Sequence, residues 1–244
     1  VHTNAHRKLA MNNRAIRLIT FDLDHTLWNP DDALVRAEAA SYQFLCEQLP
    51  AFAQIFSAQG FFDLRVQARE HYPALRFRVS ELRRVTTRDA LLQAGATAQR
   101  ADELSNQAFD IFWALRQQVA IFDEAPALLQ TLIQHFTLGA ISNGNASLRA
   151  IGLDHFFAFH FAADDFPQGK PAPDMFLAAL ARENLAPQQV LHIGDHPVDD
   201  IQGAQAVGMQ TLWVNLDRKT WPEQVRQPDF IVTDLQQIVP LLLP

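Results

Sequence analysis

Residues 19–28, ITFDLDHTLW, place two aspartates, Asp22 and Asp24, one residue apart where a short apolar run ends. The run has the length and character of a buried strand. Two carboxylates so close repel each other, so they need a compensating cation, or a task in which only one of them carries a proton. The stretch therefore predicts a buried strand that ends in a charged, reactive site.

The composition is that of an ordinary globular protein. The 244 residues are 48% hydrophobic and 19% charged, and suit one large domain or a core with a smaller insert. The formal net charge of −7 argues against a nucleic-acid-binding face. Cys46 is the only cysteine, which excludes a disulfide framework.

Targeting signals are not evident in the sequence. No apolar stretch reaches the roughly 20 residues of a membrane span. Residues 1–13 are a polar lead-in without the apolar segment of a signal peptide, and Met11 is an alternative start. We therefore expect a cytoplasmic protein that binds neither membrane nor nucleic acid, as a monomer or homodimer.

The chain changes pattern twice. Residues 31–118 show apolar residues at helical spacing and no convincing strand. After residue 119, helical segments alternate with strand-like runs at 136–142, 157–163, 190–195, 209–215 and 229–233. Such alternation predicts an α/β fold, a parallel sheet with helices on both faces. We therefore predict a core of residues 1–30 and 119–244, with residues 31–118 inserted as a helical unit.

Three of the strand-like runs, LITFDLD, LGAISNGN and LHIGDHPVDD, end in polar residues. The carboxyl ends of parallel strands meet at one crevice, so a shared site is expected from Asp22, Asp24, Ser142, Asn143, Asp195 and Asp200. Lys170 follows a predicted strand and precedes a predicted helix, so its loop lies at the same edge. Carboxylate oxygens suit Mg²⁺, which also binds phosphate oxygens.

The same residue types favour phosphoryl chemistry. A serine hydroxyl and a lysine supply a donor and a positive charge for a phosphate group. An aspartate can attack phosphorus and form an aspartyl-phosphate, while its neighbour protonates the leaving oxygen and then activates water. We predict Asp22 as the nucleophile and Asp24 as the acid/base.

The segments DLDHT, SNG, the lysine of GKPAPDMF, and GDHPVDD resemble the four ordered motifs of the haloacid dehalogenase superfamily. The resemblance covers about residues 14–30 and 119–236, and implies a Rossmann-like core, Mg²⁺ and an aspartyl intermediate. It also implies that the insert is a type-1 cap. By resemblance, the metal ligands are Asp22, the backbone carbonyl of Asp24, and Asp195, while the phosphoryl group is held by Ser142, the Asn143 amide and Lys170.

The first motif departs from the common superfamily pattern at one position, and the fourth motif offers two candidate acids. His25 stands where many members of the superfamily have glycine or aspartate. The fourth motif offers both Asp199 and Asp200, and the usual spacing favours Asp200 as a support of the metal shell. A purely structural role for Asp200 stays open. Thr26 is predicted as a second supporting residue.

Chemistry within the superfamily separates the alternatives. A dehalogenase lacks the second acid of the first motif, whereas Asp24 is present here. A phosphonatase needs a cap lysine, and residues 31–118 contain none. A sugar-phosphate mutase uses the same two aspartates, and a non-enzymatic phospho-receiver is shorter and has no helical insert. We therefore predict a phosphomonoester hydrolase, with mutase, dehalogenase and receiver as the alternatives.

The insert is expected to select the substrate. Residues 71–95 carry five arginines among aromatic residues, a set that suits an anionic or planar leaving group or simply forms a solvated helix face. The sequence also resembles, more loosely, bacterial phosphatases of flavin mononucleotide (FMN) and of 5-amino-6-(5-phosphoribitylamino)uracil, a precursor in riboflavin biosynthesis. We predict Arg76, Arg78 and Trp113 as specificity residues for a small phosphorylated metabolite.

Overall fold

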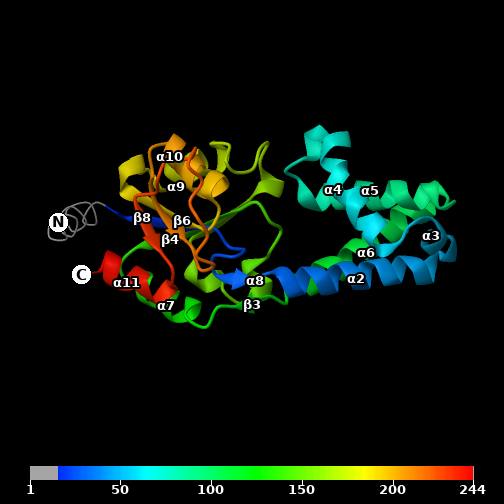
Figure 1. Cartoon of the computed structure of the whole chain (residues 1–244), viewed down its shortest axis with the longest axis horizontal. Helices are drawn as coiled ribbons and strands as arrows, with labels where there is room; N and C mark the ends of the chain where they lie inside the picture. Colours follow the sequence, from blue (N-terminus) through cyan, green and yellow to red (C-terminus); the bar gives the residue numbers. More distant parts are fainter. Residues whose placement is uncertain (1–15, 244) are drawn as a thin grey trace. The chain divides into compact units, whose positions relative to one another are not determined.

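The computed structural model describes residues 16–243, so the polar lead-in and Met11 lie outside the described residues. The described chain divides into two compact units (Figure 1). Among the described residues, the core unit comprises 16–29, Ile121–Gly144 and 148–243, and the helical unit comprises Pro30–Ala120 and Asn145–Ser147. Within residues 16–243, no helix is both long and apolar enough to cross a membrane.

The core unit is built on a six-stranded parallel sheet in the order β5-β4-β1-β6-β7-β8. Its strands are β1 Leu18–Phe21, β4 Thr137–Ser142, β5 Phe159–Ala162, β6 Val190–Gly194, β7 Gln210–Val214 and β8 Phe230–Val232. In this register Leu18 pairs with Thr137 on one side and with Val190 on the other. All four residues of β1 are buried, as expected of a strand covered on both faces. The predicted α/β fold class is confirmed.

Helices cover both faces of this sheet. Helices α9 (Asp174–Glu183) and α10 (Gly203–Ala206) lie on one side, and α7 (Ala125–Leu132) and α11 (Ile238–Leu242) on the other (Figure 1). The chain proceeds from β4 outward to β5 and then crosses to β6, on the opposite side of β1. The strand order therefore reverses at β1, and a ligand site is expected at the carboxyl end of such a switch point.

Short elements connect the main helices and strands of both units. Helix α8 spans Leu148–Ile151, and a two-stranded sheet pairs β2 (Trp28–Asn29) with β3 (Ala120–Ile121). A π-helical turn, η5, spans Pro197–Gln202 and runs directly into α10. The 3-10 turns are η1 Pro73–Leu75, η2 Asp154–Phe156, η3 Ala163–Asp165, η4 Pro187–Gln189 and η6 Leu235–Gln237.

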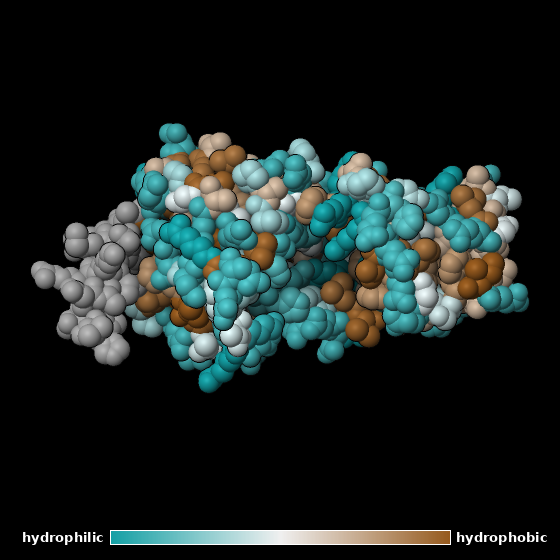
Figure 2. Space-filling model, turned by 45° about the horizontal axis from the view of Figure 1, so that its top comes forward, coloured by the Kyte–Doolittle hydropathy of each residue, from teal (hydrophilic) through white to brown (hydrophobic). Residues whose placement is uncertain are grey.

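The helical unit contains five helices: α2 Asp31–Gln48, α3 Pro50–Ile55, α4 Ala58–His71, α5 Val79–Gln93 and α6 Ala98–Arg116. Ser57 and Thr97 cap α4 and α6 by accepting hydrogen bonds from the backbone of Gly60 at 3.0 Å and Arg100 at 3.3 Å. A buried cluster that includes Leu45, Phe52, Phe61, Leu91 and Leu104 forms the interior of this unit. Hydrophobic side chains also reach its surface (Figure 2).

Candidate active site

Lys170 is the central cation of the site. Its Nζ donates to Asp22 Oδ1 at 2.6 Å, to Asp200 Oδ1 at 2.6 Å and to the carbonyl of Ile141 at 2.8 Å. Three acceptors use all three ammonium protons. The side chains of Lys170, Asp22 and Asp200 are all buried, so this ammonium is held at the ends of β1 and β4 by charge and by geometry.

Asp200 is fixed by several groups besides Lys170. Its Oδ1 lies 3.3 Å from His192 Nε2, and its Oδ2 accepts from the backbone N–H of His196 at 2.9 Å. His192 Nδ1 in turn lies 2.9 Å from Thr20 Oγ1. A Cβ atom at Gly194 would lie 2.3 Å from the Asp200 Cγ, so only glycine at the end of β6 lets this carboxylate approach.

Three carboxylates are grouped closely enough to share a metal ion. Asp22, Asp195 and Asp200 each offer an oxygen, and these oxygens lie within 4.8 Å of one another. Lys170 supplies one positive charge to the group, so three ionised carboxylates leave two negative charges uncompensated. An all-oxygen donor set with this surplus fits Mg²⁺.

The pKa values of these carboxylates reflect their burial and the same surplus of negative charge. Burial raises the pKa of Asp22 well above its usual value, and the charges of Asp200 and Asp195 add to this against the opposing Lys170 ammonium. Burial and the neighbouring Asp200 raise the pKa of Asp195 to about 6. Burial favours the neutral form of Asp200 as well, but Lys170 and His192 outweigh it and hold the pKa of Asp200 below its usual value. The single ammonium therefore stabilises Asp200 as an anion but does not satisfy all three acids.

The loop after β1 holds Asp24 in place. Asp24 Oδ1 accepts from the indole Nε1 of the buried Trp28 at 2.7 Å. The backbone N–H of His25 donates to the Trp28 carbonyl at 2.8 Å, and His25 adopts a φ of 60°, in the left-handed region that favours glycine. Thr26 Oγ1 makes a long contact of 3.4 Å to Asp22 Oδ2. The turn thus presents Asp24 half-buried beside Asp22.

Asn143 clamps the loop that carries Lys170. Its Oδ1 accepts from the Lys170 backbone N–H at 2.7 Å, and its Nδ2 donates to the Lys170 carbonyl at 2.9 Å. Ser142, buried at the end of β4, accepts from the N–H of Gly144 at 3.0 Å through Oγ, which leaves its own proton free to donate. Asp199 lies 3.4 Å from the Asn143 amide and is not among the three grouped acids.

The sequence matches one known protein family, the haloacid dehalogenase-like hydrolases, over residues 16–208. The chain belongs to this family. The hydrolase is 29% identical over 214 residues to the 5-amino-6-(5-phospho-D-ribitylamino)uracil phosphatase YigB of Escherichia coli (strain K12). The alignment covers 86% of this chain and 90% of YigB. The hydrolase is 32% identical over 158 residues to the phosphoserine phosphatase of Thermus thermophilus, covering 62% and 61%.

Among solved structures, the hydrolase resembles the 2-haloacid dehalogenase from Pseudomonas syringae pv. Tomato DC3000. The two share 40% sequence identity and superpose with a TM-score of 0.87, over 93% of this chain and 98% of the other. The superfamily membership expected from the four motifs is confirmed, and the chain is an enzyme of the hydrolase class.

The predicted site residues fall into two groups in the hydrolase. Those of the core unit gather at the ends of β1, β4 and β6, as described above. The predicted specificity residues lie in the helical unit. There, Arg78 pairs with Glu81 at 3.0 Å, the Arg76 guanidinium lies 5.6 Å from the centre of the Phe77 ring, and Trp113 is 36% exposed. Their role in specificity remains a prediction.

Three residues of the hydrolase site were not singled out from the sequence as functional: Trp28, His192 and Gly194. His192 is buried and fully bonded, as expected of a core histidine, but its partner is the site carboxylate Asp200. Gly194 directly precedes Asp195 at the end of a buried strand, and this is the signal that could have marked it. Trp28 offered no signal beyond its place four residues after Asp24.

Proposed function

We propose that the hydrolase is a Mg²⁺-dependent phosphomonoesterase that acts through an aspartyl-phosphate intermediate. The observation that carries the proposal is the pair of acids after β1, with Asp22 beside the Lys170 ammonium and Asp24 held by Trp28. Superfamily dehalogenases lack an acid at the second position. The retained Asp24 supplies the proton donor that an alkoxide leaving group needs and a halide does not.

The reaction follows from these positions. The Asp22 carboxylate attacks phosphorus, and the bond from phosphorus to the leaving oxygen breaks as Asp24 gives that oxygen its proton. Asp24 then takes a proton from water, whose oxygen attacks the aspartyl-phosphate and releases phosphate and free Asp22. The Ser142 hydroxyl and the backbone N–H of Asn143 donate to the phosphoryl oxygens, and the charge of the Lys170 ammonium stabilises their negative charge.

The metal site is part of the same proposal. Asp22, the Asp24 carbonyl and Asp195 would hold Mg²⁺, with Thr26 and Asp200 as supporting residues. When bound, Mg²⁺ neutralises charge on the phosphoryl group. The support is the surplus of two negative charges among the grouped acids, which three carboxylates and one lysine leave.

Two isosteric variants test the mechanism. With Mg²⁺ and an aryl phosphate, Asp22→Asn is expected to abolish phosphate release, because an amide does not attack phosphorus. Asp24→Asn is expected to lower kcat by about 10²- to 10⁴-fold, the usual contribution of general acid/base catalysis. Full turnover by the Asp22 variant, or by the metal-free enzyme, contradicts the mechanism.

For the substrate, we propose a small phosphorylated metabolite, and specifically the ribityl-phosphate precursor of riboflavin or FMN. The support is the similarity to YigB over 90% of that protein's length. A kcat/KM ranking across ribityl, flavin, sugar and nucleotide phosphates tests the assignment. If Arg76, Arg78 and Trp113 select the leaving group, their replacement costs about tenfold in kcat/KM on the preferred substrate, or about 1.4 kcal/mol, and little on an aryl phosphate.

Haloacid dehalogenation is the second candidate, because the dehalogenase structure is 40% identical to this chain. Chloride release from 2-chloropropionate, set beside phosphate release from an aryl phosphate, separates the two. A mutase would instead return an isomeric phosphate ester with no net phosphate release.

The proposal includes a cytoplasmic location, on the ground of the single cysteine, and a small metabolite rather than a macromolecule as the partner.

A further inference from the structure

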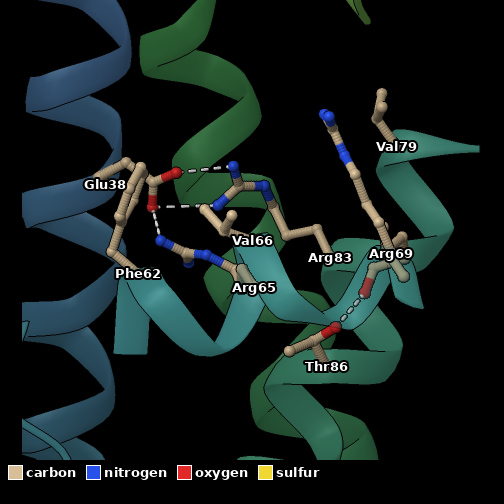
Figure 3. Close-up of a pocket in the computed structure, with 9 residues that line it drawn as sticks. Glu38, Phe62, Arg65, Val66, Arg69, Val79, Arg83 and Thr86 are labelled. Atoms are coloured by element: carbon tan, nitrogen blue, oxygen red, sulfur yellow. Dashed lines mark hydrogen bonds and ion pairs between the residues drawn. The ribbon is translucent and has the colours of Figure 1, made fainter. Parts of the chain in front are cut away.

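The helical unit contains a pocket of its own, with a volume of about 240 Å³, formed by residues of α2, α4 and α5 (Figure 3). Arg65 and Arg69 of α4 and Arg83 of α5 line it, and Glu38 of α2 is the one acidic residue in its wall. The rest of the lining is mostly apolar, and includes Val79 and Leu82. All of these residues belong to the helical unit, so the pocket shares no residue with the acidic cluster of the core unit.

One carboxylate in this pocket serves two guanidinium groups. Glu38 Oε1 accepts from Arg83 Nη2 at 2.7 Å, and Oε2 accepts from Arg83 Nη1 at 3.1 Å. The same Oε2 also pairs with Arg65 Nη2, so both arginines converge on Glu38 (Figure 3). Arg69 also lines the pocket, so the lining carries three guanidinium groups and one carboxylate, a surplus of two positive charges.

Arg65 shows the lack of a second anion most directly. Its side chain is only 10% exposed, and its Nε and Nη1 have no hydrogen-bond partner among residues 16–243. One face of its guanidinium is covered by the Phe61 ring, 4.4 Å away. Burial and the charge of Arg83 lower the pKa of Arg65 to about 10. Buried charged donors without acceptors are unfavourable, and an oxyanion in the pocket would supply the acceptors.

The pocket also has an apolar rim. Phe62 and Val66 lie one turn apart on α4, line the pocket, and are 44% and 57% exposed. Exposed large apolar side chains beside half-buried arginines are typical of a surface that binds a ligand with both an apolar and an anionic part. A purely structural arginine cluster requires neither the exposed rim nor the unpaired donors.

We propose that this pocket binds a small organic anion, with a carboxylate or phosphate head at Arg65, Arg69 and Arg83 and a short apolar group against Phe62 and Val66. The guanidinium fork matches either head, since both present two oxygens in one plane. The proposal does not depend on the reaction of the core unit, because none of the residues that carry it belongs to that unit.

Ligand-observed ¹⁹F NMR on the full chain, in buffer with a chelator, tests the proposal with two probes, 4-fluorobenzoate and 4-fluorophenylphosphonate. Saturable binding of at least one probe is expected. Arg69→Gln is expected to weaken it about tenfold, because one charge-assisted contact is removed. Glu38→Gln is expected to tighten it, because the competing carboxylate is gone. Arg100→Gln, at an exposed arginine of α6 outside the pocket, is the matched control and leaves binding unchanged.

The outcomes divide cleanly. Binding of the benzoate alone assigns a carboxylate head, and binding of the phosphonate alone assigns a phosphate head, provided that Arg69→Gln weakens either one. Binding of neither probe, or binding that Arg69→Gln leaves unchanged, overturns the proposal. Weaker binding in Glu38→Gln at an unchanged melting temperature overturns it too, because the charge argument requires the opposite sign.

Discussion

Replacing Lys170 by methionine removes the cation that bridges Asp22 and Asp200. The change keeps most of the side-chain length and apolar volume, so the effect is on charge rather than on packing. The lost contacts are the two ion pairs at 2.6 Å and the bond to the Ile141 carbonyl at 2.8 Å. Both carboxylates are then buried without a positive neighbour at those distances.

The size of the effect follows from the protonation states. Removing one partner of a buried ion pair costs about 3–5 kcal/mol, because a buried charge is left uncompensated. Burial already raises the pKa of Asp22, so in the variant Asp22 takes up a proton and escapes part of this cost. Asp200 takes up a proton less readily, because its contact with His192 and its hydrogen bond from the His196 N–H remain when Lys170 is replaced. We therefore expect a loss near the lower end, about 3 kcal/mol at neutral pH.

Urea unfolding in a chelating buffer, followed by circular dichroism, measures this loss. Lys219→Met is the matched control, since Lys219 pairs with Asp217 at 2.8 Å but both side chains are about two-thirds exposed, and such pairs contribute little. The loss in Lys170→Met should also shrink as the pH falls to about 5. In that variant the folded-state pKa values of Asp22 and Asp200 lie above their unfolded values, so the penalty is present above them and is relieved as the acids are protonated.

The reasoning fails if Lys170→Met and Lys219→Met unfold at the same urea concentration. It also fails if the loss in Lys170→Met grows rather than shrinks in acid. Either result means that the buried carboxylates are not ionised in the wild-type protein, or that a group other than Lys170 compensates them.

Three further changes probe other parts of the core unit and its site. Gly194→Ala should lower stability by about 1–3 kcal/mol, the usual cost of overpacking, because Asp200 leaves no room for a Cβ. The control is Gly60→Ala, whose Cβ meets only the Ser57 hydroxyl at 3.2 Å, and it should show no such loss in the same unfolding assay. Burial lowers the pKa of His160 from 6.5, so the folded state binds fewer protons and loses stability as the pH falls below that value. In His160→Gln, the drop in urea midpoint between about pH 7.5 and about pH 5.5 should be smaller than in the wild type. An equal drop assigns the pH dependence to other groups. Asp195→Asn should raise the Mg²⁺ concentration for half-maximal phosphate release, and an unchanged requirement removes Asp195 from the metal site.

The sheet was predictable because each of its main strands has a recognisable apolar run in the local sequence. All four residues of β1 are buried and three of them are apolar, and the other main strands are similar runs separated by helices. Parallel geometry then brings strand ends together, which is why residues as distant as Asp22 and Asp200 could be placed in one site. Strands β2 and β3 were missed because two residues each are too short to show a period.

What escaped prediction depends on contacts between distant segments. Asn143 was expected to act through its backbone amide, whereas its side chain also clamps the backbone of Lys170, 27 positions away. The pairing of Glu38 with Arg83 spans 45 positions on two helices, and each residue alone resembles a solvated helix face. The local sequence pattern predicts which residues of a segment are buried, but not which residues of other segments they contact.

The backbone hydrogen bond from Phe122 N–H to the Leu27 carbonyl, at 3.1 Å, ties the point where the chain leaves the core unit to the point where it returns. The core therefore closes on itself at this bond, whatever lies between the two residues. Because the entropy of closing a loop grows only with the logarithm of its length, lengthening, shortening or exchanging the intervening segment changes the stability of the core by little. Evolution is thereby free to rewrite the segment between these residues as an interchangeable module, while the catalytic sheet stays as it is.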